Sequence, residues 1–318
     1  MYESLHNHTT ASDGPVDYLE LLRVAETNGY GVMAMTDHDV LPSQEDLAKL
    51  KAYDGPVKWL AGVELSSGLP HELGGGPAQL FHILGLFVDP TNEALITHCT
   101  KAVAARNDRM EKMVTNLRLI GFDITAEDCL ADSGGEAVGR RNISRALERS
   151  PRYEKVMDRL RNQMAEEAKE DPQVAMAYMR MLDGPIRDHP YRLFLSDDAY
   201  LDNVYVDYSF WADMDESVKL IREAGGVAIL AHWPTISDEI PLEMLEGFIR
   251  EGRLDGIELR TGVVEDEKER VEQELTALAE RTGCATTIGI DGHSLRVIEI
   301  FATKPLADRT LLDRPPSS

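Results

Sequence analysis

Residues of the kinds that bind metals recur along this chain directly after apolar, strand-like segments. His6 and His8 follow such a segment at the start, and Asp291 and His293 follow residues 285–290 near the end. Further apolar runs lead into Asp37, His38 and Asp39, into Glu64, and into His232. In a parallel barrel the strands end on one face, where side chains far apart in sequence can converge. The pattern therefore predicts a hydrolase with more than one metal ion.

The two densest groups of candidate ligands differ in how specific they are. His6 and His8 project to the same side of a strand, because alternate residues do so, and such a pair can chelate one ion. Asp37, His38 and Asp39 place ionisable groups in succession at the end of a buried strand. That succession is costly unless a metal or a partner neutralises it. The second group is therefore the more specific signal.

Four other candidates, Asp13, Glu64, His82 and His232, are ambiguous when taken singly. Asp13 precedes Gly14-Pro15 and could equally form a turn or cap a helix. A lone Glu at a strand end is usually solvated, and a lone His in an apolar run is usually a core residue. Together, however, the positions supply six histidines and three carboxylates. This mixed donor set suits Mn, Fe or Zn rather than Ca or bare Mg, so we expect two or three divalent transition metals.

Length and charge restrict the class of substrate. A chain of 318 residues that is 43% hydrophobic can bury a substantial core, as one large barrel or as two smaller domains. Its 56 acidic residues outnumber 33 basic ones, for a formal charge of −23. Affinity for long polyanions comes mainly from Lys and Arg that neutralise phosphates. The sequence therefore favours a small substrate over long duplex nucleic acid.

Cysteine usage and hydropathy indicate a cytoplasmic protein. Cys99, Cys129 and Cys284 are scattered without CxxC spacing, so neither a disulfide framework nor a thiolate zinc site is expected. The start of the sequence lacks a basic segment followed by an apolar stretch, and no apolar run reaches the length of about 18 residues that spans a membrane. Neither secretion nor a membrane partner is expected.

The pattern of apolar and charged segments predicts an α/β barrel interrupted by a helical insertion. Strand-like and helical runs alternate over 1–92 and again over 184–318, which is the rhythm of a parallel sheet. Residues 93–183 are charge-laced with helical spacing and predict a cap over the barrel mouth. Residues 71–79 contain three successive glycines but lack the Gly-Lys-Ser/Thr ending of a phosphate-binding loop, so they predict a hairpin.

The order of the motifs resembles that of the PHP family, the polymerase and histidinol phosphatase superfamily of metal-dependent phosphoesterases. The matching segments cover nearly the whole chain and are His6-x-His8 with Asp13, Thr36-Asp37-His38-Asp39, Gly62-Val63-Glu64-Leu65-Ser66, Phe81-His82-Ile83, Ala231-His232 and Asp291-x-His293. The resemblance implies a distorted (β/α)7 TIM-like barrel with up to three metals at its C-terminal face. The insertion followed by 216–231 looks most like the small stand-alone branch. Members of that branch include a nucleoside 3′,5′-bisphosphate phosphatase and 5′-to-3′ exonucleases for short RNA.

The resemblance also implies how the ligands divide over a trinuclear centre. The sets are His6, His8, Glu64 and Asp291 for the first metal, Glu64, His82 and His232 for the second, and Asp13, His38 and His293 for the third. Asp37 and Asp39 would orient ligating imidazoles by accepting their other N–H. Two close metals can generate hydroxide near neutral pH and bind the phosphoryl oxygens during in-line attack.

Expected substrate contacts come first from the insertion. Gly139-Arg140-Arg141-Asn142 resembles a family segment that reads Gly-Arg-Pro-His, in which the Arg and the His face the substrate. Arg141 stands where Pro is usual and Asn142 where His is usual, and an amide can hydrogen-bond but cannot titrate. We expect Arg140, Arg141 and Asn142 to act in catalysis and substrate binding, together with the catalytic Glu64 and Asp37. The alternative is an arginine pair on a solvated helix end.

Three barrel positions are further candidates for substrate binding. Trp233 stands where the family has Pro after the metal-binding His, and it could stack on a base or pack at the barrel rim. Arg260 and Thr261 follow the strand-like run 256–259 and are placed to touch phosphate.

The function that these residues predict is hydrolysis of phosphate esters of nucleotides or short oligonucleotides by metal-activated hydroxide. Examples are a nucleoside 3′,5′-bisphosphate or a 5′-phosphorylated RNA end. Three alternatives remain open: a phosphatase of the histidinol phosphate type, an amidohydrolase-like metal hydrolase, and a non-catalytic nucleotide sensor. The exact substrate, the native metal and the oligomeric state do not follow from the sequence.

Overall fold

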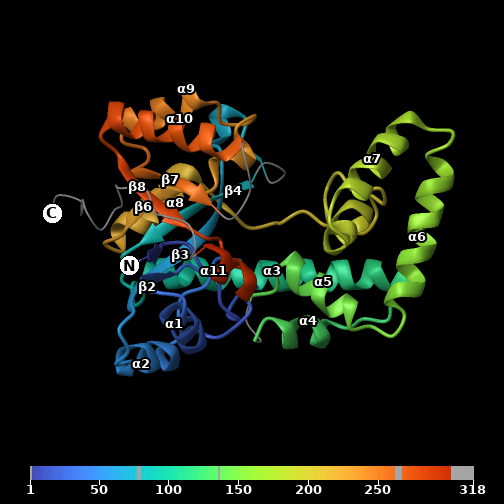
Figure 1. The fold of residues 1–318 in the computed structure, drawn as a ribbon, viewed down its shortest axis with the longest axis horizontal. Helices are drawn as coiled ribbons and strands as arrows, with labels where there is room; N and C mark the ends of the chain where they lie inside the picture. The colour runs from blue at the N-terminus through green and yellow to red at the C-terminus, as the bar shows by residue number, and fades with distance from the viewer. Residues whose placement is uncertain (1, 77–79, 135–136, 262–266, 302–318) are drawn as a thin grey trace. The chain divides into compact units, whose positions relative to one another are not determined.

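The computed structural model describes residues 2–76, 80–134, 137–261 and 267–301. The chain divides into two compact units, shown in Figure 1. Unit 1 comprises residues 1–103 and 210–318, and unit 2 comprises residues 104–209. The boundary falls inside one long helix, α3 (Glu93–Leu119). The sequence-based limits of the insertion, 93 and 183, stay a prediction.

Unit 1 is built on one mixed sheet of eight strands among the described residues. The strands are β1 (Tyr2–Ser4), β2 (Tyr30–Met35), β3 (Lys58–Gly68), β4 (Leu80–Leu86), β5 (Ala212–Asp213), β6 (Val227–Leu230), β7 (Gly256–Thr261) and β8 (Ala285–Gly289). Their order is β1-β2-β3-β4-β6-β7-β8, and β5 pairs with β3. The expected α/β class is confirmed.

The sheet is not parallel throughout, contrary to the sequence prediction. Strand β4 runs antiparallel to both β3 and β6, whereas the other pairings are parallel. A parallel pair needs a crossover of a dozen or more residues, usually a helix. The described part of the connection from β3 to β4 contains only the short 3₁₀ turn η1 (His71–Leu73). The chain therefore turns back on itself in the predicted hairpin, and that reversal makes the sheet mixed.

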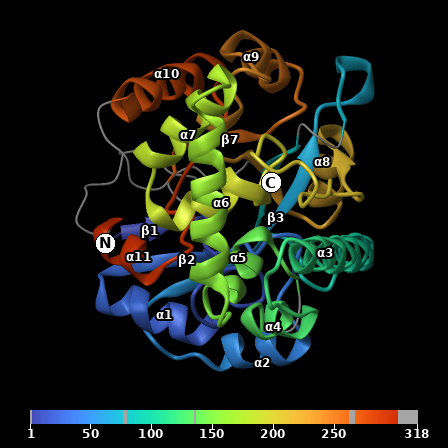
Figure 2. The same cartoon turned by 90° about the vertical axis from the view of Figure 1, so that its right-hand side faces the viewer.

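Helices surround the strands of unit 1 in both views (Figures 1 and 2). They are α1 (Tyr18–Thr27), α2 (Gln44–Ala52), the first part of α3, α8 (Met214–Glu223), α9 (Leu242–Arg250), α10 (Glu267–Thr282) and α11 (Leu295–Phe301). Aspartates begin two of them. Asp17 accepts from the backbone N of Glu20, and Asp213 accepts from that of Glu216. Such caps satisfy amide groups that a helix leaves unpaired at its first turn.

Strand alternation separates two apolar layers on the faces of the sheet. Val63 and Leu65 of β3 pack in one cluster with Val218 and Ile221 of α8. Leu84 belongs to a second cluster with Leu5, Leu86, Ile229 and Ala231 from three strands or their ends. Residues 63 and 65 point to one face and residue 64 to the other. Glu64 therefore projects to the face opposite the helix-packed one.

Hydrogen bonds join the segments that follow β1 and β8, the first and last strands of the sheet order. The N–H of Leu5 donates to the carbonyl of Ile288 at 2.9 Å, and that of Asp291 donates to His6 at 3.1 Å. Asn7 and Gly292 form an isolated parallel bridge. Residues near the two ends of the sequence are thus fixed beside one another.

Unit 2 is helical and has a core of its own. Its elements are the second part of α3, α4 (Ala126–Asp132), α5 (Arg140–Glu148), α6 (Tyr153–Glu167), α7 (Pro172–Asp183), the turn η2 (Ile186–Asp188) and the π-helical turn η3 (Tyr191–Leu195). Met113, Leu147, Met157, Leu160 and Phe194 are buried in one cluster. The helical character expected for 93–183 is therefore observed.

Candidate metal centre

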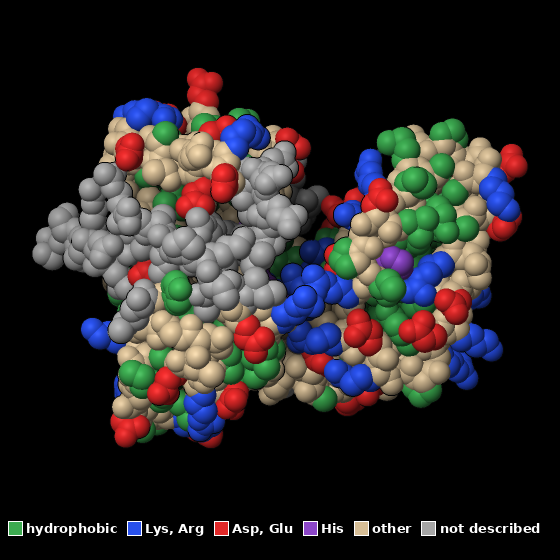
Figure 3. Space-filling model, viewed as in Figure 1, with side chains coloured by type: hydrophobic (Ala, Val, Ile, Leu, Met, Phe, Trp, Pro, Cys, Tyr) green, Lys and Arg blue, Asp and Glu red, His purple; other side chains and the backbone are tan. Residues whose placement is uncertain are grey.

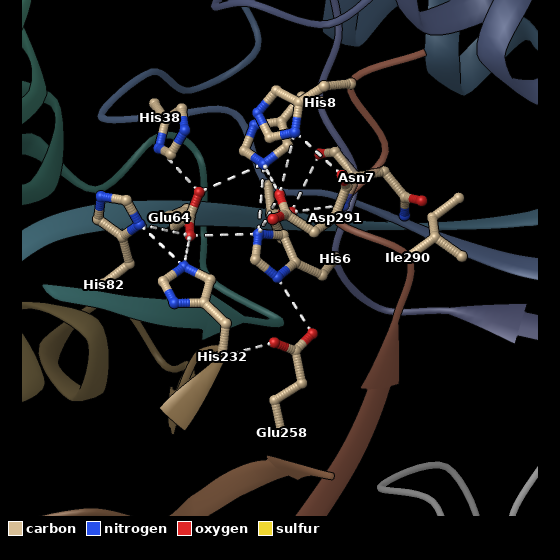
Figure 4. Close-up of polar contacts among 12 residues, drawn as sticks. His6, Asn7, His8, His38, Glu64, His82, His232, Glu258, Ile290 and Asp291 are labelled. Carbon is tan, nitrogen blue, oxygen red and sulfur yellow. Dashed lines mark hydrogen bonds and ion pairs between the residues drawn. The ribbon is translucent and has the colours of Figure 1, made fainter. Parts of the chain in front are cut away.

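The structure brings the nine predicted metal ligands together in unit 1, at the ends of strands. Most of them are labelled in Figure 4. The first pair follows β1, His38 follows β2, Glu64 lies in β3 and His82 in β4. His232 follows β6, the last pair follows β8, and Asp13 lies in the loop between β1 and α1. Ligands from separate strands meet at the strand ends, as the sequence predicts. The exception is His82, whose strand β4 runs antiparallel to its neighbours.

Glu64 is the centre of the cluster and is completely buried. Each of its carboxylate oxygens faces a different group of imidazoles, as Figure 4 shows. Oε1 lies 3.2 Å from His6 Nε2, 3.0 Å from His82 Nδ1 and 3.2 Å from His232 Nε2. Oε2 lies 3.3 Å from His8 Nε2 and 2.8 Å from His38 Nδ1. A carboxylate placed in this way can bridge two cations.

Among the described residues, three groups of side chains have ligand atoms that lie within 4.8 Å of one another. The first group is His6, His8 and Glu64, and the second is His38, Glu64 and His82. The third is His8, Asp13, His38 and His293. Asp291 joins the first group, because its Oδ1 lies 3.5 Å from His6 Nε2 and 3.1 Å from His8 Nε2. The grouping resembles the expected division, but His8 and His38 each take part in two groups.

Several contacts in the cluster suit a bound cation better than a hydrogen bond. The Nε2 atoms of His6 and His8 lie 3.2 Å apart, and His82 Nδ1 lies 3.0 Å from His232 Nε2. The Nδ1 atom of His8 is buried without a hydrogen-bond partner. Buried polar atoms in proteins are normally satisfied. Imidazoles and carboxylates arranged like this fit Mn, Fe or Zn.

The protonation states of Glu64, Asp13 and His38 also favour metal binding. Burial raises the pKa of the Glu64 carboxyl, but His38, His82 and His6 outweigh it and hold the pKa well below its ordinary value. The pKa of Asp13 is likewise well below normal, because His293 and His38 overcome the effect of burial. Burial lowers the pKa of His38 to about 4. Near neutral pH these groups are anionic or neutral, the forms that ligate metals.

Glu258 is a residue of the centre that the sequence reasoning missed. It lies in β7 and is 1% exposed. Its Oε1 lies 3.1 Å from His6 Nδ1, and its Oε2 accepts from the backbone N of His232 at 2.9 Å. A carboxylate on the second nitrogen of a ligating imidazole fixes the ring's tautomer and orientation. The missed signal is a carboxylate inside an apolar strand, which is costly to bury without a partner.

Asp37 and Asp39 have other partners than the imidazoles expected for them. Asp37 accepts from the backbone N and the hydroxyl of Thr9, at 2.7 and 2.9 Å, and from Ser12 Oγ at 2.6 Å. Asp39 accepts from the backbone N and the hydroxyl of Ser66, at 2.7 and 2.8 Å. Because Thr9 and Ser12 lie between His8 and Asp13, Asp37 fixes the loop that carries these ligands. For Asp37 these partners correct the prediction of a direct imidazole contact, and for Asp39 that contact stays a prediction.

Backbone strain is concentrated at the strand ends of the centre. Asp39, His232 and Asp291 have φ angles of 55°, 30° and 48°. Residues other than glycine avoid this region, at a cost of roughly 1–3 kcal/mol each. Such geometry persists where the surrounding contacts require it, and it re-aims side chains as the chain leaves a strand.

Trp233 packs in the core rather than facing a ligand. It is 6% exposed and belongs to the cluster of Ile236, Ile240 and Leu245. Its indole N–H donates to the carbonyl of Ile240 at 2.7 Å. Of the two expected roles, the burial and the bonded N–H favour packing over base stacking.

The segment Arg140–Asn142 begins helix α5 in unit 2. Asn142 is completely buried, its Oδ1 accepts from the backbone N of Gly139 at 2.7 Å, and its Nδ2 donates to Asp132 at 3.2 Å. The amide thus caps the helix, which corrects the expectation that it contacts substrate. Arg141 is exposed.

Arg140 lies among arginines and tyrosines of the same unit. Its guanidinium lies 5.8 and 5.9 Å from the ring centroids of Tyr191 and Tyr205. Arg109 lies 4.9 Å from Tyr205, and burial lowers its pKa to about 10. The space-filling view shows Lys and Arg side chains gathered on one side of this unit (Figure 3). The remaining predicted contacts, Arg260 and Thr261, lie at the end of β7, and their side chains are outside the described part.

Comparisons with known proteins show which proteins this chain and its fold are similar to. The chain is 26% identical over 228 residues to a 5′–3′ exoribonuclease of Haemophilus influenzae, a match of 72% of this chain and 67% of that protein. It is 25% identical over 232 residues to a 3′,5′-nucleoside bisphosphate phosphatase of Chromobacterium violaceum, a match of 72% and 65%. A candidate metal-dependent phosphoesterase of Bifidobacterium adolescentis has the same fold, with a TM-score of 0.66 and 23% identity over 97% of this chain and 91% of that one. No family model matches the chain.

Fold and cluster define the class of this protein: an α/β protein with a buried histidine–carboxylate centre suited to divalent metals. The two curated relatives are named as an RNA nuclease and a nucleoside bisphosphate phosphatase, so the chain is similar to phosphoesterases, as the sequence predicts. The matches span 67% and 65% of the two relatives. Within the described residues, no helix is both long enough and apolar enough to cross a membrane.

Proposed function

We propose that this protein is a metal-dependent phosphoesterase that hydrolyses phosphate esters of nucleotides or short oligonucleotides. The observation that carries the proposal is the buried Glu64 carboxylate, which meets three imidazoles through one oxygen and two through the other. Two proteins that this chain is similar to are a 5′–3′ exoribonuclease and a 3′,5′-nucleoside bisphosphate phosphatase.

We assign the ligands to three sets, which are His6, His8, Glu64 and Asp291, then Glu64, His82 and His232, then Asp13, His38 and His293. The distances around Glu64 and the third group of neighbouring ligand atoms support this division. Bound divalent transition metals would activate water and neutralise the phosphoryl oxygens during attack. Glu64 would separate the first two cations and compensate their charge.

The protein's own residues would hold this arrangement rigid. Glu258 fixes the ring of His6 and the backbone of His232. Asp37 fixes the loop between His8 and Asp13 through Thr9 and Ser12. Arg140 in unit 2 would supply a cation for a substrate phosphate, as the likeness to the Gly-Arg-Pro-His segment implies.

We further propose that the sheet of unit 1 closes into a (β/α)7-type barrel. The hydrogen bond from Leu5 to Ile288 and the bridge between Asn7 and Gly292 support closure between the first and last strands of the order. In this arrangement the cluster of Leu5, Leu84 and Ile229 would fill the interior beneath the metal centre.

Elemental analysis combined with a substrate screen tests the proposed function. Protein purified with Mn, Fe or Zn should contain two or three ions per chain and release phosphate from a nucleoside 3′,5′-bisphosphate or a short 5′-phosphorylated RNA. Histidinol phosphate and a cyclic amide serve as the substrates of the alternative enzymes. Preference for histidinol phosphate would indicate a phosphatase of that type, and preference for the cyclic amide would indicate an amidohydrolase-like enzyme. Metal binding without turnover of any ester would indicate a nucleotide sensor.

A further inference from the structure

Trp211 is an aromatic residue on the same face of the sheet as the metal centre. Strand β5 pairs with β3 in parallel register, with Ala212 beside Ser67, so Trp211 lies beside Ser66. Residues in register across a parallel pair point to the same face, and residues two apart in a strand do the same. Trp211 therefore shares its face with Ser66 and with Glu64.

Gly68 makes room for this indole. A Cβ atom at Gly68 would lie 2.9 Å from Cζ3 and 3.0 Å from Cε3 of Trp211, and 3.5 Å from a methyl group of Leu80. The six-membered ring thus covers the backbone on the side where a side chain of residue 68 would be. This contact locates the ring on the Glu64 face independently of the pairing argument.

The register of the hairpin relates the indole to the metal ligands. Opposite residues in the antiparallel pair are Glu64 with Leu84, Ser66 with His82 and Gly68 with Leu80. His82 Nδ1 lies 3.0 Å from Glu64 Oε1, and Figure 4 shows the two side chains facing each other. The pair Gly68–Leu80 is the next pair along this face, so it lies about 7 Å beyond His82 at roughly 3.3 Å per residue.

The surroundings of Trp211 are those of a surface for ligand contact rather than of a core. The residue is partly exposed, and so is Leu80 beside it. The exposed ring of His71, in the turn η1, lies 5.5 Å from the indole at 59°. Trp233, by contrast, is buried with its N–H bonded. Trp59 lies at an odd position of β3 and packs in a different cluster, on the opposite face.

We propose that Trp211 is the stacking platform for the base of a nucleotide substrate, with Gly68 and Leu80 setting the position of its ring. The inference rests on the proposed phosphoesterase function and deepens it. A phosphate at the metal centre and a base on the indole would be separated by about the length of a sugar. The platform has no preference for one base, because every base offers a π face.

The test compares a nucleoside 3′,5′-bisphosphate with its abasic counterpart, in which hydrogen replaces the base. Trp211→Ala should lower kcat/KM for the nucleotide by roughly 5- to 150-fold, the worth of one base-stacking contact. The abasic compound should change by no more than about twofold, because it makes no stacking contact. Trp211→Phe should retain most of the preference for the nucleotide, and Trp211→Leu should lose it. Trp59→Phe, on the opposite face, is the matched control and should change neither substrate.

Equal loss for both substrates in Trp211→Ala and Trp211→Leu would show a structural role and overturn the inference. No change for either substrate would overturn it as well, while the phosphoesterase function would stand.

Binding of a non-hydrolysable phosphonate analogue separates this inference from the proposed function. Calorimetry with the nucleotide analogue and with its abasic form needs no turnover. Affinity that falls in Trp211→Ala for the nucleotide analogue alone supports the platform even if no ester is hydrolysed. Unchanged affinity for both analogues would refute the platform, whatever the enzyme's activity.

Discussion

At the scale of single residues, the charge of Glu64 is the most sensitive feature of the centre. Glu64→Gln removes the carboxylate charge at the point where two ligand sets meet. We therefore expect metal content to fall and kcat to drop by several orders of magnitude, as for other groups on which charge stabilisation depends. Elemental analysis and phosphate release measure the two effects. The exposed Glu243 of α9 offers the matched control Glu243→Gln. Activity near that of the unmodified protein would rule out the bridging role.

Glu258 should act through His6 rather than on the substrate. Glu258→Gln replaces the carboxylate that lies 3.1 Å from the imidazole and should lower metal affinity by about 10- to 100-fold. Competition with a chelating dye gives the affinity directly. Activity should return when excess metal is supplied, a rescue that loss of a substrate contact would not allow.

The proton on His6 should compete with metal. Burial lowers the pKa of His6, but Glu64, Glu258 and Asp291 together raise it well above its ordinary value. In metal-free protein the imidazole therefore holds its proton to a higher pH than an ordinary histidine, and metal binding must displace that proton. Affinity should rise with pH across the neutral range, and binding should release protons. Calorimetry in two buffers of different ionisation enthalpy detects the release, and equal apparent enthalpies would contradict it.

At the scale of elements, two residues at the start of α5 should have different roles. Asn142 should contribute to stability and Arg140 to substrate binding. Asn142→Ala removes the cap on Gly139 and the bond to Asp132, and should lower the free energy of unfolding by about 1–3 kcal/mol with little change in kcat/KM. Arg140→Ala should instead lower kcat/KM by a factor equivalent to about 1.5–3 kcal/mol, with metal content unchanged. The exposed Arg152 gives the control Arg152→Ala. If Asn142→Ala lowered kcat/KM without lowering the free energy of unfolding, Asn142 would be a substrate contact after all.

The same elements show what could be predicted from the sequence. Apolar runs that end in His, Asp or Glu locate most of the candidate ligands at strand ends, since those groups are costly to bury alone. Asp13 in a loop and His82 inside a strand could be predicted only from the order of the motifs. The direction of β4 depends on pairing between strands, which local periodicity does not contain. Trp233 and Trp211 differ only in what packs around them, so the sequence could not tell the buried indole from the partly exposed one.

At the scale of the whole molecule, charge should select against large substrates. A net charge of −23 repels polyanions and offers few cations to replace their counterions. A nucleoside bisphosphate or a short single strand should therefore exceed a long duplex in kcat/KM, by a margin that narrows as salt is added. Rates for the two substrates at several salt concentrations test this. Efficient cleavage of a duplex at low salt would overturn the electrostatic argument.

The hydrogen bonds that fix Leu5 beside Ile288, and Asp291 beside His6, mean that the metal centre can be completed only after both segments have been made. His8 and Asp291 lie 283 positions apart in the sequence, so His6 and His8 are made well before Asp291 and His293. Contacts this distant in sequence form late and slowly. A nascent chain can thus fold the helical residues 104–209 long before its ligand set is complete. The complete metal centre can therefore form only after the residues that follow β8 have been made.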